Sequence, residues 1–145
     1  MERIEKQMQF ILEIDKEKQI KRKTLQSNGK DFEDDAQHAW HMAIMTLLLS
    51  EYANEKIDVL KTISMLLIHD LVEIDAGDTY AYDDQGLKTQ NERENLAANR
   101  IFNLLPEDQA KKIFDLWNEF EERKTPEAKF ARVTVSYTHL RAHET

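Results

Sequence analysis

The stretch M-L-L-I-H-D-L-V-E-I-D-A-G-D, from Met65 to Asp78, carries most of the information about this chain because it ends an apolar helix in a polar cluster. His69 and Asp70 close the apolar run, and Glu73 follows one turn later. On a helix, residues three or four apart share a flank, so the spacing predicts that these three side chains lie together. Leaving them buried without partners would cost of order 2–7 kcal/mol for each neutral polar group and more for an ion. A divalent cation would satisfy them together.

Composition limits what kind of protein this is. At 145 residues the chain fits one domain, and 41% hydrophobic with 33% charged residues indicates a globular protein. Three glycines and two prolines favour long helices over a turn-rich β fold. The formal net charge of -8 argues against a nucleic-acid-binding surface. The chain has no cysteine, so a metal site must use histidine, aspartate and glutamate.

The sequence also gives no sign of a membrane protein. No stretch approaches the roughly 18–20 apolar residues of a membrane span. The charged N-terminus, M-E-R-I-E-K-Q-M, contains no signal-peptide core. We therefore expect no membrane partner and a cytoplasmic location.

Apolar periodicity predicts an all-α fold of about six helices. The expected helices cover residues 1–20, 35–53, 56–74, 92–105, 106–123 and 128–134, and residues 21–33 and 80–87 are expected to be loops. Asp34 is predicted to cap the second helix, in which Trp40, Ile44 and Leu47 belong to an apolar stripe. Gly77 is predicted to stop the third helix.

The last eleven residues break the helical pattern. Val135 to Thr145, V-S-Y-T-H-L-R-A-H-E-T, changes abruptly to β-branched and hydroxyl residues and looks like a translated sequencing adapter. We therefore expect the domain to cover residues 1–134 and residues 135–145 to be a non-native tail. The alternative is a disordered natural tail. The prediction excludes His139 and His143 as ligands.

Three histidines then remain as candidates, namely His38, His41 and His69. A cation held by two histidines and carboxylates from different helices is typical of a hydrolytic site, where it activates water. Glu73 could accept the proton of that water, and Asp78 could protonate a leaving group or order a second water.

Each of these residues also has a simpler interpretation. His38 could be a helix-end histidine, and His41 a core or boundary residue. Glu73 could be a solvated helix residue, and Asp78 could cap a turn. The pattern H-D-x-x-E-x-x-x-G-D, taken in order, is much more specific than its parts.

Several motifs together resemble one family. They are D-A-Q-H-A-W at 35–40, L-L-I-H-D-L-V-E-I-D-A-G-D-T at 66–79, L-L-P-E-D-Q at 104–109, D-L-W-N-E-F-E at 115–121 and T-P-E-A-K-F-A at 125–131. On these motifs the chain resembles the HD-domain phosphohydrolases, in the branch of 5'-deoxynucleotidases, over nearly its whole length to Thr134.

The resemblance implies an HD-domain helical bundle that binds a divalent cation such as manganese or cobalt. It assigns His38, His69 and Asp70 as metal ligands. It matches Glu73 to a position implicated in water activation and Asp78 to one implicated in leaving-group protonation.

Three further positions follow from the same resemblance. Arg22 matches a contact to the substrate phosphate, with a solvated loop charge as the alternative. The family's fourth metal ligand, an aspartate, is expected at position 135, where this chain has Val135. Gln37 stands where the family usually has glutamate before the first histidine, which would weaken a supporting hydrogen bond. We therefore expect the chain as written to bind metal poorly.

The predicted function is a metal-dependent phosphomonoesterase that hydrolyses nucleoside, especially deoxynucleoside, 5'-monophosphates by attack of metal-bound hydroxide. The resemblance also implies a homodimer. Two alternatives stay open: a non-catalytic HD module that binds a nucleotide or a protein, and a polar cluster that is only a buried ion-pair network.

Overall fold

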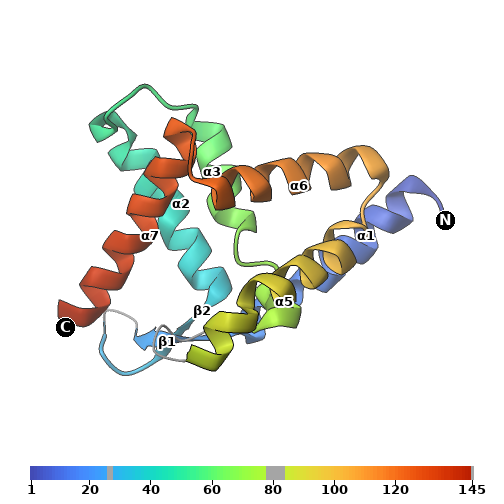
Figure 1. The fold of residues 1–145 in the computed structure, drawn as a ribbon, viewed down its shortest axis with the longest axis horizontal. Helices are drawn as coiled ribbons and strands as arrows, with labels where there is room; N and C mark the ends of the chain where they lie inside the picture. Colours follow the sequence, from blue (N-terminus) through green and yellow to red (C-terminus); the bar gives the residue numbers. More distant parts are fainter. Residues whose placement is uncertain (26–27, 78–83, 145) are drawn as a thin grey trace.

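The fold is a bundle of helices with one small β hairpin beside it, as the computed structural model in Figure 1 shows for residues 1–25, 28–77 and 84–144. The helices are α1 (Arg3–Ile14), α2 (Asp35–Leu49), α3 (Val59–Ile68), α4 (Glu73–Ala76), α5 (Asp84–Phe102), α6 (Glu107–Glu122) and α7 (Pro126–Glu144). Two short 3-10 helices, η1 (Asp15–Gln19) and η2 (Ser50–Tyr52), follow α1 and α2. The predicted all-α fold class is confirmed: six of these α-helices are long, and α4 is a single turn.

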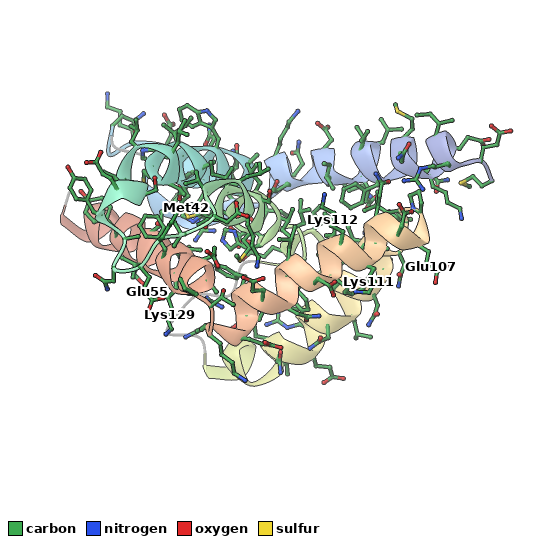
Figure 2. The ribbon with its side chains drawn as sticks, turned by 90° about the horizontal axis from the view of Figure 1, so that it is seen from above. Met42, Glu55, Glu107, Lys111, Lys112 and Lys129 are labelled. Atoms are coloured by element: carbon green, nitrogen blue, oxygen red, sulfur yellow. The ribbon has the colours of Figure 1, made fainter. Side chains whose placement is uncertain are left out.

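The core has two parts, and α6 contributes to both. In one part Trp117 packs with apolar residues of α4 and α5, and α1 adds Phe10 and Ile14 at its edge. In the other, Phe120 packs with Met42 of α2 and with residues of α3 and α7. Figure 2 shows Met42 inside the bundle, whereas Glu107 and Lys111 lie along the exposed side of α6.

The predicted loop at 21–33 is wrong, because this segment contains a hairpin. Strands β1 (Lys21–Leu25) and β2 (Phe32–Asp34) pair antiparallel, with Lys21 opposite Asp34. An isolated two-stranded hairpin is at best marginally stable, so its neighbours must hold it in place. The backbone of Asp35 donates to the carbonyl of Ile20, 3.0 Å away, which ties the hairpin to the start of α2. Such tertiary support leaves no periodic signal in the sequence.

The predicted helix over 56–74 is interrupted where its polar cluster begins. Helix α3 ends at Ile68, His69 is its C-cap, and α4 starts only at Glu73. Between them the amide of Glu73 donates to the carbonyl of Asp70 at 2.9 Å, a tight turn rather than a continued helix. His69 and Asp70 thus lie at the end of α3, and not on one straight helix with Glu73. Gly77 does end α4, with a φ of 78° that favours glycine.

Helix α2 buries the opposite face from the one that its apolar stripe suggests. Trp40, Ile44 and Leu47 are exposed, by 63%, 41% and 58%. The side chains that α2 does bury are Asp35, His38, Ala39, Met42 and Thr46. The polar residues lie inward because the helix forms one wall of a polar site, which apolar periodicity alone cannot indicate. The predicted N-cap is confirmed, since the Asp34 carboxylate accepts from the amide of Gln37 at 2.8 Å.

Other boundaries also differ from the prediction. Helix α5 begins at Asp84 and ends at Phe102, rather than covering 92–105. The predicted loop at 80–87 is therefore wrong for residues 84–87, and residues 80–83 lie outside the described residues. Helix α7 runs to Glu144 instead of ending at 134, because each residue added to an existing helix gains one hydrogen bond at low cost. That continuation leaves the non-native origin of residues 135–145 as a prediction. Among the described residues, no helix combines the length and the apolar character that crossing a membrane requires.

Candidate metal centre

The first turn of α2 and the end of α3 bring together the three residues predicted as metal ligands. His38, His69 and Asp70 each offer a ligand atom, and these atoms all lie within 4.8 Å of one another. All three side chains are buried, with exposed fractions of 1%, 8% and 9%. The break after α3 places His69 and Asp70 at this point, facing His38 across the interior.

The two histidine rings are oriented as metal-binding histidines usually are. Nδ1 of His38 lies 2.9 Å from Oε1 of Glu33, and Nδ1 of His69 lies 2.7 Å from the carbonyl oxygen of Leu66. Both partners are acceptors, so each Nδ1 donates its proton. Nε2 of His69 lies 3.1 Å from Oδ2 of Asp70. Nε2 of His38 is buried and has no hydrogen-bond partner among the described residues. This unpartnered nitrogen beside a carboxylate fits a divalent cation.

Arg22 reaches the same place from β1. Its Nη1 lies 3.1 Å from Oδ1 of Asp35 and 3.2 Å from Oδ2 of Asp70. The residue is 8% exposed, so the alternative of a solvated loop charge is wrong. The guanidinium partly compensates two buried carboxylates, one of which is a predicted ligand.

Further carboxylates surround this arginine. Asp35, Asp70 and Glu73 offer oxygens within 4.8 Å of one another. Burial raises the pKa of Asp35 to about 6, and burial with the charges of Asp70 and Asp35 raises the pKa of Glu17 to about 8. Asp70 behaves in the opposite way: burial alone would raise its pKa, but His69 and Arg22 hold it well below its usual range. Neighbouring positive charge therefore keeps this predicted ligand ionised.

The histidines differ as well. Burial lowers the pKa of His38, which favours the neutral ring that a metal requires. Burial would also lower the pKa of His69, but the adjacent Asp70 raises it overall.

A polar cavity of about 390 Å³ opens beside these residues, a volume within the usual range for small-molecule sites. Side chains from the hairpin, from the α3–α4 turn and from α5, α6 and α7 line what we call the polar cavity. They are Arg22, His69, Asp70, Val72, Glu73, Gln90, Asn91, Glu94, Phe120, Glu121, Arg123, Arg132 and Val135. Position 135, where the resemblance places a fourth ligand, therefore lies on the wall of the same cavity as Asp70.

Other predicted residues fall elsewhere. Asp78 lies outside the described residues. His41 is exposed and stacks on Trp40, so its interpretation as a core residue is wrong. Gln37 completes the cap of α2, with its Oε1 3.1 Å from the amide of Asp34.

The sequence did not point to three of the residues that support the site. Glu33 orients His38, Glu17 lies buried near the cluster, and Asp35 holds Arg22. Neither Glu17 nor Glu33 shares a helical spacing with the ligands, so only the 3-10 turn and the hairpin bring them close. Asp35 lies three residues before His38 on α2.

Comparisons with known proteins identify the family of this chain. The sequence profile of the HD domain family matches residues 14–141. The 5'-deoxynucleotidase HDDC2 of Dictyostelium discoideum is 33% identical over 127 residues, which cover 83% of this chain and 67% of that protein. The human 5'-deoxynucleotidase HDDC2 is 30% identical over 95 residues, covering 66% of this chain.

A solved structure is similar over most of the fold. The crystal structure of a predicted metal-dependent phosphohydrolase from Magnetospirillum magnetotacticum MS-1 superposes with a TM-score of 0.86 at 48% sequence identity. The match covers 91% of this chain and 66% of that one. The match to the human 5'-deoxynucleotidase HDDC2 covers only 45% of the length of that protein. On the family profile and these relatives, this chain belongs to the HD domain family.

Proposed function

We propose that this chain carries the site of a metal-dependent phosphomonoesterase that hydrolyses nucleoside 5'-monophosphates, with deoxynucleotides as the preferred class. The observation that carries the proposal is the pairing of buried His38 and His69, each with Nδ1 held by an acceptor, beside the carboxylate of Asp70. The name 5'-deoxynucleotidase, borne by relatives about 30% identical, supports the substrate class.

Each residue around the cation would have a separate role. His38, His69 and Asp70 would hold it, and when bound it would polarise a phosphoryl oxygen and lower the pKa of water. Glu73 lines the polar cavity close to Asp70 and would accept the proton of the attacking water. Arg22 would stabilise negative charge on the phosphoryl oxygens. We keep Asp78 as the proposed acid for the leaving group, on the resemblance alone.

Position 135 is the one departure that favours the alternative of a non-catalytic binding module. Val135 lines the polar cavity but cannot coordinate a cation. Losing one carboxylate ligand should cost at least the roughly 10–100-fold that changes around a metal site commonly cost. We therefore propose that an aspartate at 135 completes the site.

A phosphate-release assay tests the function. The chain and its Val135→Asp variant are incubated with manganese or cobalt and a panel of nucleoside and deoxynucleoside 5'-monophosphates. We expect slow release by the chain, faster release by the variant, and none by Val135→Asp combined with Asp70→Asn. No release by the Val135→Asp variant with any metal or substrate would instead favour the binding module. The homodimer implied by the resemblance stays a prediction, which sedimentation of the purified chain would test.

A further inference from the structure

Helix α7 places a positively charged side chain, Arg132, in the polar cavity. The proposed reaction gives this side chain no role. Arg132 lies three residues before Val135, and both line the cavity. Residues three apart on a helix are neighbours on one flank, with about 5–6 Å between their Cβ atoms. The side chain of Arg132 therefore starts beside the position expected to hold the fourth ligand.

Aromatic contacts hold this guanidinium in a fixed place relative to the metal ligands. The guanidinium carbon of Arg132 lies 4.1 Å from the centre of the Phe120 ring. That ring packs in turn against the His69 ring, with 4.9 Å between their centroids. Phe120 itself is 2% exposed. The arrangement orients Arg132 through a rigid core side chain, which lowers the entropic cost of using it to bind a ligand.

The hydrogen-bonding capacity of Arg132 is poorly used within the protein. Its ion pair joins Nη2 to Oε2 of Glu121 at 3.4 Å, which is long for a charged pair. Its Nε is buried and has no partner among the described residues. A buried donor without an acceptor is costly, so the site favours a ligand that supplies acceptor oxygens. The planar guanidinium fork matches a phosphate in geometry and charge.

We propose that Arg132, which lines the same polar cavity as Arg22, is a second phosphate-binding residue of the substrate site. The inference rests on the proposed function for its ligand, the 5'-phosphate of a nucleoside monophosphate. Arg22 is shared between Asp35 and Asp70, so much of its charge is already compensated. Arg132 adds a second charge to the cavity from α7, where it would bind phosphoryl oxygens that Arg22 on β1 does not.

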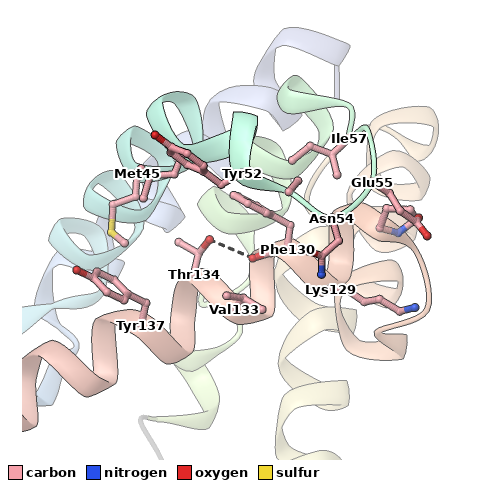
Figure 3. Close-up of a pocket in the computed structure, with 13 residues that line it drawn as sticks. Met45, Tyr52, Asn54, Glu55, Ile57, Lys129, Phe130, Val133, Thr134 and Tyr137 are labelled. Atoms are coloured by element: carbon pink, nitrogen blue, oxygen red, sulfur yellow. Dashed lines mark hydrogen bonds between the residues drawn. The ribbon is translucent and has the colours of Figure 1, made fainter.

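Binding measurements test this assignment without requiring turnover. Calorimetry with manganese present measures the affinity for deoxyadenosine 5'-monophosphate and for deoxyadenosine. The chain carries Val135→Asp together with Glu73→Gln, which removes the proposed base so that turnover does not consume the monophosphate. The test variant is Arg132→Gln, whose methylene groups still cover the Phe120 ring. The matched control is Lys129→Gln, which removes one charge from the same helix but lines a different hollow, the apolar groove of Figure 3.

We expect Arg132→Gln to weaken binding of the monophosphate roughly 10- to 100-fold, the range for a lost hydrogen bond to a charged group. The affinity of Arg132→Gln for deoxyadenosine should stay within about twofold of the parent value. The affinities of Lys129→Gln for the monophosphate and for deoxyadenosine should also stay within about twofold. Arg132→Lys should recover part of the loss, because it restores charge but not the fork.

Three results would overturn the inference: unchanged monophosphate affinity in Arg132→Gln, an equal loss for deoxyadenosine, or an equal loss in Lys129→Gln. The last would mean that only long-range charge matters. If Arg132→Gln weakens the monophosphate alone while no variant ever releases phosphate, the anion site stands and the proposed function fails. If Val135→Asp turns over and Arg132→Gln leaves its KM unchanged, the function stands and this inference fails.

Discussion

Helix α7 separates two hollows of similar size and opposite character. On one flank Arg132 and Val135 face the polar cavity, of about 390 Å³. On the other, Phe130, Val133 and Tyr137 face an apolar groove of about 460 Å³, walled by the end of α2 and the segment after it. Figure 3 shows this apolar groove, with Glu55 and Lys129 together at one end.

The difference between the hollows lies in how their polar atoms are used. In the apolar groove the Thr134 hydroxyl donates to the carbonyl of Phe130 within its own helix, 3.0 Å away, so the helix satisfies it locally. In the polar cavity Nε of Arg132 is buried without a partner among the described residues. The same is true of Nε2 of His38, which does not line the cavity but lies beside His69 and Asp70, which do. Volume therefore does not distinguish a binding site here, whereas buried polar atoms awaiting a partner do.

The largest expected effect comes from Glu73, the proposed base of the polar cavity. Glu73→Gln, made in the Val135→Asp chain, should lower kcat by about 10²–10⁴-fold, the usual contribution of a general base. Manganese affinity should change little, because Glu73 is not a proposed ligand. Steady-state phosphate release and manganese calorimetry measure the two quantities. Glu55→Gln in the apolar groove is the control, and a similar kcat in both variants would contradict the role.

The second-largest expected effect is on manganese affinity, and it compares the two flanks of α7 directly. Val135→Asp places a carboxylate in the polar cavity and should raise manganese affinity about 10–100-fold. Val133→Asp places the same carboxylate on the other flank, where Val133 is exposed, and should leave the affinity unchanged. Both are measured by calorimetric titration. An equal gain in the two variants would mean that added charge, and not a fourth ligand, attracts the cation.

The smallest expected effect is on stability and comes from Glu17. Its pKa is about 8 in the fold and near 4.5 when unfolded, because burial disfavours its charge. Between these values the folded chain binds a proton that the unfolded chain has lost, so stability falls as pH rises through this window. Glu17→Gln cannot ionise and should flatten that fall.

Thermal melts of the metal-free chain from pH 5 to pH 9 measure this effect. At pH 9 the Glu17→Gln variant should exceed the native chain by at least about 1 kcal/mol, or roughly 2–4 °C in Tm. Exposed Glu55→Gln should follow the native curve. Parallel curves for native chain and Glu17→Gln would show that Glu17 titrates normally.

The comparison of the hollows also explains what the sequence predicted and what it could not. Local signals predicted two helix ends correctly: Asp34 caps α2 and Gly77 ends α4. Apolar periodicity failed on α2, because a helix that lines a polar site buries Asp35 and His38 and exposes Trp40.

The site was predictable only where its residues are close in the sequence or belong to a motif. His69, Asp70 and Glu73 formed a visible cluster, and the resemblance added His38 and Arg22. Glu17 and Glu33 lie near these residues only because a 3-10 turn and a hairpin bring them there. Arg132 was missed because a lone arginine on a helix has no local signal; its meaning comes from Phe120, to which only tertiary packing joins it.

We propose that His38, His69 and Asp70 together hold a divalent cation beside the polar cavity, and a manganese titration of the Val135→Asp chain tests this most directly. The geometry predicts one manganese ion per chain, with affinity lowered at least about 100-fold when His38→Gln and Asp70→Asn are combined. Manganese uptake that survives this double substitution, or no uptake of any divalent cation by the Val135→Asp chain, would contradict it.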